Sequence, residues 1–312
     1  MDAVSRLSHE AQTGDLLSDL LRTVRLRGDG AVHLAPERPY TIEFGTRTGM
    51  VHIFERGDCK LRVEGIDQPF AVREGDIALV PRPRRHVIAL GAHRRPHEPR
   101  PEDLVLDQER ARTSPRWLSG SYQLEAPSGG HLLAELPEVI VLTGLGDRVL
   151  DWLDLSRRML LEEIEAPGQG SGVMVSRILD LLFVQIVRAW ASRPGADPSW
   201  MSGAMDPQIG RVLTDIHADP ARPWTVAALA RRAHLSRSAF AQRFAERVGR
   251  TPAAYVAELR LELAADQLRV TGDPVNVIAT TVGYRSGAAF TRAFTKRFGV
   301  APREWRSGGG NG

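Results

Sequence analysis

Three side chains in the first hundred residues have the types that a transition-metal site would use. His52 and Glu55 lie in MVHIFERGD, and His86 lies near the end of GDIALVPRPRRHVI. Two imidazoles and a carboxylate can form a facial set of three metal ligands. Glu55 is three positions from His52, so in a strand the two side chains lie on opposite faces. We therefore expect no bound metal or other cofactor, and keep His52 and His86 as candidate contacts to an effector or a metal.

The other polar residues give no catalytic set. His9, His33, His131 and His217 are scattered, and no nucleophile, base and orienting acid can be assigned. Cys59 is the single cysteine, which excludes an intramolecular disulfide and a cysteine-based zinc site and fits a reducing cytoplasm. No stretch has the length and apolar character of a membrane span. The sequence predicts a cytoplasmic protein that is not an enzyme and contacts no membrane.

A repeat in the last hundred residues suggests a different chemistry. The stretch LSRSAFAQRF is followed about fifty residues later by the similar GYRSGAAFTRAF. Five positions recur at identical spacings, the last with a different aromatic residue: Phe240, Phe244, Gly249, Pro252 and Tyr255 match Phe290, Phe294, Gly299, Pro302 and Trp305. Each copy predicts two helices joined by a turn, with Ser236 or Ser286 as N-cap of the second helix. Gly283 can supply a positive φ in the second turn.

The second helix of each copy has an outward face suited to reading DNA bases. The phenylalanines mark the buried stripe, so the opposite positions face outward. These positions include Ser238, Ala241 and Gln242 in the first copy, and Ala288, Thr291, Arg292 and Lys296 in the second. Small residues let a helix lie deep in a major groove, while Gln can pair with adenine and Arg with guanine. The flanking residues predicted to contact phosphates are Arg237, Arg243, Arg247, Arg285 and Arg297.

The charge distribution agrees with a polyanionic partner for this region. Residues 206 to 312 contain 16 Lys and Arg against 9 Asp and Glu, a net charge of +7, whereas the whole chain of 312 residues has +3. A basic segment alone is weak evidence, because surface cations often only solvate a face. Together with the repeat, it favours binding to double-stranded DNA.

The signature IAxxVGYxSxxxFxRAFxxxFGxxPxxxR is nearly complete over Ile278 to Arg306. With it, the segment from about Ile209 to Arg306 resembles the DNA-binding domain of the AraC/XylS family of bacterial transcription regulators. The resemblance implies two recognition helices that enter successive major-groove segments on one face of the duplex. It places base contacts at Arg237, Ser238, Ala241 and Gln242, then at Gly287, Ala288, Thr291 and Arg292. Ala241 and Gly287 cannot donate a side-chain hydrogen bond, so base reading falls to Gln242 and Arg292.

The first two thirds of the chain predict a β region followed by two helices. Apolar residues have helical spacing over residues 15 to 27, and over residues 28 to 90 the pattern changes to short alternating runs broken by turn residues. Residues 91 to 115 have the composition of an exposed loop. Helices are expected over 146 to 165 and 172 to 191. The second is apolar around most of its circumference, which indicates burial either against a second subunit or between two domains. Residues 193 to 207 have the composition of a linker.

Gly75, Pro81 and His86 have the spacing of the second motif of cupin barrels. The order of a cupin-like β-barrel, two helices, a linker and paired helix-turn-helix units is similar to AraC-family regulators with an N-terminal cupin domain. We predict an α+β multidomain chain with a regulatory barrel over 1–145, a helical hairpin over 146–192, a linker over 193–207, a DNA-binding domain over 208–306 and a tail over 307–312. The resemblance implies a small-molecule effector, a homodimer and, for an activator, RNA polymerase as partner.

Two alternatives stay open at this point. A cupin metalloenzyme with an accessory DNA-binding tail would need a metal, yet the first cupin motif normally has two histidines separated by one residue, and only His52 is present. An effector-independent DNA binder would use the barrel for dimerisation alone.

Overall fold

A computed structural model describes residues 15–18, 26–37, 39–45, 47–91, 95–104, 114–124, 135–144, 147–193 and 195–308. The chain divides into two compact units. One contains Arg25–Glu125 and Leu136–Trp190, and the other contains Ala191–Gly312 with the short segments Met1–Val24 and Ala126–Glu135. Most of the predicted helix at 15 to 27, much of the predicted loop at 91 to 115 and most of the tail lie outside the described residues.

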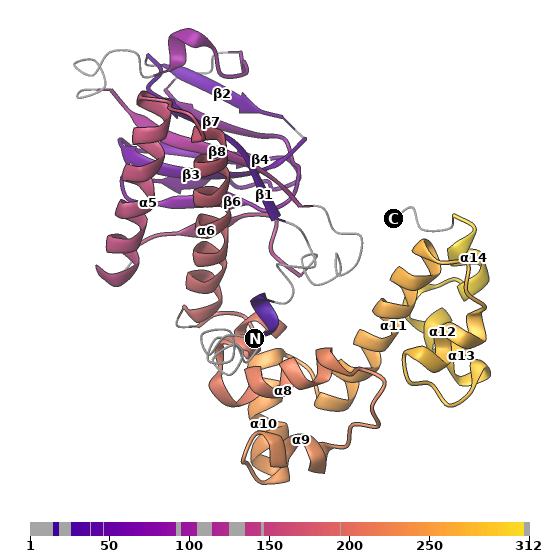
Figure 1. Cartoon of the computed structure of the whole chain (residues 1–312). Helices are drawn as coiled ribbons and strands as arrows, with labels where there is room; N and C mark the ends of the chain where they lie inside the picture. The colour runs from indigo at the N-terminus through magenta and orange to yellow at the C-terminus, as the bar shows by residue number, and fades with distance from the viewer. Residues whose placement is uncertain are drawn as a thin grey trace. The chain divides into compact units, whose positions relative to one another are not determined.

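The first unit contains two antiparallel sheets (Figure 1). The five-stranded sheet has the order β1-β8-β3-β6-β9, and the four-stranded sheet has the order β2-β7-β4-β5. The strands are β1 (Leu26–Leu34), β2 (Tyr40–Phe44), β3 (Gly49–Arg56), β4 (Cys59–Val63), β5 (Phe70–Val72), β6 (Ile77–Val80), β7 (His86–Leu90), β8 (Arg116–Leu124) and β9 (Ile140–Leu142), with a 3₁₀ turn η1 (Pro101–Asp103) after β7. The predicted sheet-rich region is therefore confirmed, while its closure into a barrel stays a prediction.

Alternation of apolar and polar residues builds the core between the sheets. In β4, Cys59, Leu61 and Val63 are buried while the residues between them are exposed, as expected for a strand with one buried face. The core also holds large aromatic rings: the centroids of Tyr40 and Trp117 are 5.5 Å apart. Packing of this kind fills the space between the sheets with side chains in direct contact.

Two helices belong to the same unit, α5 (Asp147–Glu165) and α6 (Ser171–Ser192). Both agree with the predicted hairpin. Helix α6 approaches the five-stranded sheet closely at two glycines, because a Cβ on Gly28 would lie 2.6 Å from the Ser176 carbonyl oxygen and one on Gly120 would lie 2.2 Å from a methyl carbon of Leu179. The Gly28 amide donates a 2.9 Å hydrogen bond to Asp180 of the helix. Small residues in β1 and β8 thus seat α6 against the sheet.

The second unit is helical. Its helices are α7 (Trp200–Met205), α8 (Pro207–Ala218), α9 (Val226–Arg232), α10 (Arg237–Val248), α11 (Pro252–Val270), α12 (Val275–Thr281), α13 (Gly287–Phe298) and α14 (Pro302–Arg306). Helix α7 lies inside the segment predicted as the linker, so that prediction needs correction. Trp200 and Met201 are buried, and Ser199 caps the helix by accepting from the Ser202 amide. Burial of the tryptophan overrides the loop-like composition around it.

The repeat corresponds to two helix pairs of the same construction, α9–α10 and α12–α13. Ser236 and Ser286 cap the second helices as predicted. Each second helix ends at a left-handed glycine, Gly249 with φ 80° and Gly299 with φ 79°. The shared features continue beyond them, since Phe244 meets Tyr255 and Phe294 meets Trp305 in edge-on ring contacts at 5.8 and 5.9 Å. The recurring residue types therefore rebuild the same packing twice.

Candidate nucleic-acid interface and regulatory site

Helix α10 presents its predicted reading residues to the surface. Phe240 and Phe244 are fully buried, which turns Arg237, Ser238 and Gln242 outward, all exposed, with Ala241 half-buried beside them. The Gln242 amide donates a 2.8 Å hydrogen bond to Glu246 one turn later. A side-chain amide held in this way has one donor engaged and its carbonyl still available to a base edge.

Helix α13 has the same arrangement with more positive charge. Phe290 and Phe294 are fully buried. The predicted residues of this unit are all exposed: Arg285, Gly287, Ala288, Thr291, Arg292, Lys296 and Arg297. Among the described residues, Arg285, Arg292 and Lys296 have no ion-pair partner. Three cations beside small side chains fit a helix that enters a groove of a polyanion.

Three of the predicted phosphate contacts have partners within the protein. Arg247 forms a 3.4 Å ion pair with Asp206. Arg243 donates from Nε and Nη2 to Asp206 Oδ2 at 2.9 and 2.8 Å. Arg297 forms a 3.1 Å ion pair with Glu262 and lies over the ring of Phe298. A role in phosphate binding stays a prediction for all three, and for Arg243 and Arg247 it would compete with the ion pair to Asp206.

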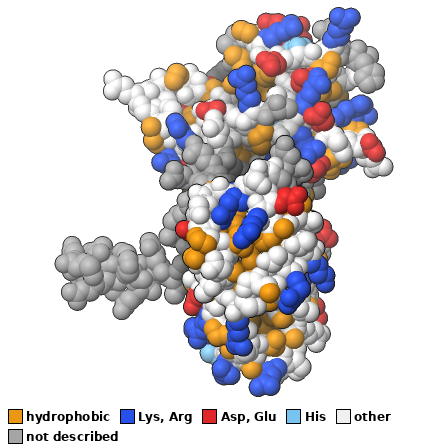
Figure 2. Space-filling model, turned by 90° about the vertical axis from the view of Figure 1, so that its right-hand side faces the viewer, with side chains coloured by type: hydrophobic (Ala, Val, Ile, Leu, Met, Phe, Trp, Pro, Cys, Tyr) orange, Lys and Arg blue, Asp and Glu red, His pale blue; other side chains and the backbone are white. Residues whose placement is uncertain are grey.

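The helical unit carries an excess of basic side chains over acidic ones. In Figure 2, whose lower half contains this unit, blue Lys and Arg side chains are more numerous than red Asp and Glu side chains. Orange apolar side chains lie between them. This excess corresponds to the net charge of +7 over residues 206 to 312, and such a charge attracts nucleic acid over distances of about 8 Å at physiological salt.

In the first unit, His52 of β3 and His86 of β7 form a buried pair that joins the two sheets. Their Nε2 atoms are 2.8 Å apart, His52 Nδ1 lies 2.9 Å from Ser119 Oγ, and His86 Nδ1 lies 2.8 Å from the Arg84 carbonyl oxygen. Because a carbonyl only accepts, His86 Nδ1 carries the proton and His52 donates from Nε2. The Ser119 hydroxyl then donates to His52 and accepts from the Trp117 indole at 3.0 Å.

One neutral tautomer of each ring therefore satisfies the whole network. Burial lowers the pKa of His52 well below its usual value, and the neighbouring His86 lowers it further. Burial also lowers the pKa of His86. Phe44 contacts both rings, with centroids 4.7 and 5.1 Å away. This apolar enclosure keeps both histidines uncharged near neutral pH.

Glu55 lies on the opposite face of β3, as the spacing predicted, and is the centre of an ion cluster. Its side chain is only 4% exposed. Oε1 accepts from Arg157 of α5 at 2.8 Å, while Oε2 accepts from Arg116 at 3.1 Å and lies 2.8 Å from His33 Nε2. Burial alone would raise the pKa of Glu55, but the hydrogen bonds from His33 and Arg157 outweigh it and hold the pKa at about 2.

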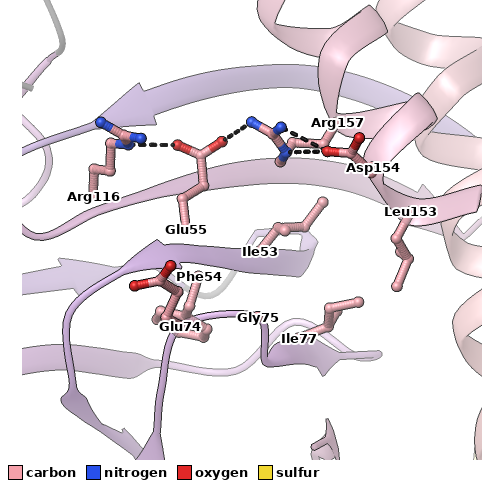
Figure 3. Close-up of a pocket in the computed structure, with 10 residues that line it drawn as sticks. All are labelled: Ile53, Phe54, Glu55, Glu74, Gly75, Ile77, Arg116, Leu153, Asp154 and Arg157. Atoms are coloured by element: carbon pink, nitrogen blue, oxygen red, sulfur yellow. Dashed lines mark hydrogen bonds and ion pairs between the residues drawn. The ribbon is translucent and has the colours of Figure 1, made fainter. Parts of the chain in front are cut away.

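The Glu55 cluster lies beside a cavity of about 310 Å³ between the outer face of the five-stranded sheet and α5. Figure 3 displays the residues around it, with Glu55 linked to Arg116 on one side and to Arg157 on the other. The lining residues are Ile53, Phe54, Glu55, Glu74, Gly75, Ile77, Arg116, Leu153, Asp154 and Arg157.

Comparison with known proteins decides the family. Residues 15–192 match the cupin family, and residues 229–308 match a helix-turn-helix domain. An RCS-specific HTH-type transcriptional activator of Escherichia coli is 31% identical over 256 residues, which cover 82% of this chain and 83% of that protein. The chain belongs to the AraC-type transcription regulators with an N-terminal cupin domain.

Other relatives of this regulator have similar descriptions. An AraC-like transcription regulator of Streptomyces lividans is 29% identical over 299 residues, which cover 94% of this chain and 98% of that protein. Among solved structures, the DNA-binding domain of AdpA in complex with a target DNA is 27% identical, with a TM-score of 0.31, and covers 33% of this chain and 91% of that chain. The function of the regulator is transcription control through an AraC-type DNA-binding domain, and its relatives are named as regulators rather than enzymes.

The cupin domain of the regulator does not fit a metal at the predicted histidines. The pair supplies only two nitrogen ligands, fewer than the three or four protein ligands that transition-metal sites use, and its two Nε2 atoms, 2.8 Å apart, are joined by a hydrogen bond. Glu55 contacts other partners on the far face of β3. Within the described ranges, no three His, Cys, Asp or Glu residues are placed to hold a metal ion.

Several residues that matter in the regulator escaped the sequence analysis. Asp206, Arg116 and Arg157 each take part in ion pairs with residues 37 to 102 positions away. No periodic pattern in the sequence signals such pairs. The helices of the described residues include none long and apolar enough to cross a membrane.

Proposed function

We propose that the regulator binds a specific DNA site with both helix pairs, each acting as a helix-turn-helix unit, and reads bases with α10 and α13. The observation that carries this proposal is the duplicated construction: a serine cap, a buried phenylalanine pair and a left-handed glycine in each unit. Two equal units in one chain suit two adjacent major-groove segments. Gln242 and Arg292 are the proposed base-reading residues, and Arg237, Arg285 and Lys296 the proposed phosphate contacts.

The experiment is a selection of binding sites from a random duplex library, with the full chain at a fixed near-physiological salt concentration. Two short motifs about one helical turn apart are expected. A single enriched motif would mean that only one unit reads bases. Absence of any enrichment, when the same preparation still retains duplex DNA on a filter at low salt, would overturn sequence-specific reading.

We also infer a homodimer formed through the helical hairpin. Both helices carry exposed apolar side chains, with Leu155 and Met159 on α5 and Met174 and Leu181 on α6. Leu155 and Met159, four positions apart, share one face of α5, and Met174 and Leu181, seven apart, share one face of α6; an apolar face of this kind suits contact with a partner. Sedimentation velocity should detect a dimer that Leu181→Glu dissociates, while Lys60→Glu, at an exposed position on β4 of the same domain, serves as the control.

Control by a small-molecule effector bound to the cupin domain completes the proposal, with RNA polymerase as a further partner if the protein activates. The site of action is the cytoplasm, where bacterial DNA lies.

A cupin enzyme with a DNA-binding tail is not favoured, because the donor set at His52 and His86 does not fit a metal. An effector-independent binder is the alternative outcome, and DNA affinity that is constant across a metabolite screen would favour it.

A further inference from the structure

The cavity beside Glu55 is better suited to a ligand than the space between the two sheets. That inner space is filled by aromatic rings and by the His52–His86 pair, which are linked by pairwise ring contacts. The cavity lies on the opposite face of the five-stranded sheet, under α5, and has about 310 Å³. A volume of this size matches the lower end of the range of small-molecule sites.

The walls of the cavity combine an apolar surface with charges. Ile53, Ile77 and Leu153 are buried side chains that border it. They offer contact to an apolar body of a few carbon atoms. Burial of such a body in place of water would supply most of the binding free energy.

The charges favour a cation. Three carboxylates line the cavity, from Glu55, Glu74 and Asp154, against two guanidinium groups. Both guanidinium groups are already paired, since Arg116 donates to Glu55 and Arg157 donates to Glu55 and Asp154. Among the described residues, Glu74 has no ion-pair partner, so its carboxylate is the one left for a ligand.

We propose that this cavity binds a small organic cation, with an ammonium group at Glu74 and an apolar body against Ile53, Ile77 and Leu153. This inference rests on the proposed effector control and gives the effector a chemical class and a place. An anionic ligand would have to displace Glu55 or Asp154 from an arginine. Glu55, with its three partners, resists such displacement.

Helix α5 connects the cavity to the proposed dimer interface. Leu153, Asp154 and Arg157 reach the cavity from one side of the helix, whereas Leu155 and Met159 are 56% and 37% exposed. A ligand that contacts Leu153 and lies beside the Arg157–Glu55 ion pair would change how α5 rests on the sheet. The position of the apolar residues on the other side of α5 would change with it.

The test is calorimetric titration of the full chain, without DNA, with three probes of similar size and shape. Phenethylammonium carries the cation, 2-phenylethanol is neutral, and 3-phenylpropanoate is anionic. We expect saturable binding of phenethylammonium only. Glu74→Gln should weaken it at least about tenfold, the loss of one charge-assisted hydrogen bond, whereas Glu64→Gln, an exposed glutamate of the same domain, should leave it unchanged.

Three outcomes would each overturn the proposal. The protein binds 3-phenylpropanoate in place of the cation, Glu74→Gln binds phenethylammonium as tightly as the wild type, or phenethylammonium shows no saturable binding at millimolar concentration. Leu153→Trp, which fills the cavity, should abolish binding in a protein whose circular dichroism is unchanged. Because no DNA is present, these outcomes are independent of DNA reading. Saturating phenethylammonium should then change the affinity of the protein for the selected DNA site. An unchanged affinity would contradict the regulatory role of the cavity but not its binding of the cation.

Discussion

Arg243, on the proposed reading helix α10, is bound to Asp206, whose carboxylate also caps the neighbouring helix α8. Asp206 Oδ2 accepts from Arg243 at 2.8 and 2.9 Å, and Oδ1 accepts from the amides of Gln208 and Ile209 at 3.0 and 3.1 Å. The carboxylate is 2% exposed. One buried side chain thus sets the start of α8 and the orientation of an arginine on α10.

Asp206→Ala should destabilise the helical unit by roughly 2 kcal/mol, because it removes a helix cap and leaves Arg243 without its partner. Urea denaturation followed by circular dichroism measures the loss. Asp197→Ala is the matched control: its side chain is 91% exposed and its ion pair with Arg193 spans 4.0 Å, so it should cost less than about 0.5 kcal/mol. Equal losses for the two variants would contradict the assigned role of Asp206.

Arg243 and Arg237 should behave differently although both were predicted to contact phosphates. Arg243→Ala should lower the unfolding free energy by about 1 to 2 kcal/mol, through its hydrogen bonds to a charged group. Arg237→Ala should leave stability unchanged, weaken binding to all duplexes alike and reduce the salt slope of log K by about one. Urea denaturation measures the loss of stability, and filter binding at several salt concentrations measures the affinity and its salt slope. A changed base preference in Arg237→Ala would mean that this residue reads bases.

The local features of the helical unit could be predicted because they depend on residues close in sequence. Gly283 has the expected positive φ, 90°, and the spacing of the phenylalanines fixed the buried stripe of each second helix. His234 occupies the same position in the first unit with φ 55°. The sequence does not signal a histidine in the left-handed region, because the surrounding structure has to offset the free energy that this conformation costs.

The cluster around Glu55 could not be predicted, because its members are separated by long stretches of chain. The carboxylate meets His33 from β1 and Arg157 from α5, which are 22 and 102 residues away. A register shift in the pairing of β3 with β8 lies at this glutamate, and such a bulge redirects a side chain. Strand alternation alone indicates the face of Glu55 but not its partners.

The stability of the regulator should fall as the pH falls below about 6.5. His52 and His86 have lowered pKa values in the folded state, so below pH 6.5 the unfolded chain binds protons that the folded protein does not. The loss is at most about 1.4 kcal/mol per pH unit for each histidine. Urea denaturation between pH 7.5 and pH 5.5, about one unit above and below the usual histidine pKa, measures how the unfolding free energy changes with pH.

The double variant His52→Leu/His86→Leu is the control for this slope. It should have a flatter pH profile than the wild type over the same range. Glu55 does not contribute there, because its pKa of about 2 means that its stabilisation is lost only as the pH falls below about 4.5. Identical profiles of the wild type and the double variant would show that another group titrates.

Two glycines of β1 provide a test of how α6 rests on the sheet. Gly28→Ala should cost about 1 to 3 kcal/mol, since its methyl group would meet the Ser176 backbone at 2.6 Å and push the helix away. Gly30→Ala is the matched control, because nothing lies within 4 Å of its Cβ position. It should be neutral or stabilise slightly. Thermal unfolding compares the two, and equal effects would mean that α6 accommodates the added methyl group.

Arg292 should carry base specificity in the second unit. Arg292→Ala should cost about 1 to 3 kcal/mol on the selected site and relax the preference at one base position, because an arginine donates two hydrogen bonds to guanine. Arg211→Ala is the control, because Arg211 is an exposed arginine on α8. It should leave the base preference unchanged and lower the affinity only as far as the loss of one positive charge does. The measurement is a second selection with each variant at the same salt concentration. If the selected site of Arg292→Ala keeps the wild-type preference at every position, Arg292 only positions the helix, and reading in this unit must come from Thr291 and the neighbouring backbone.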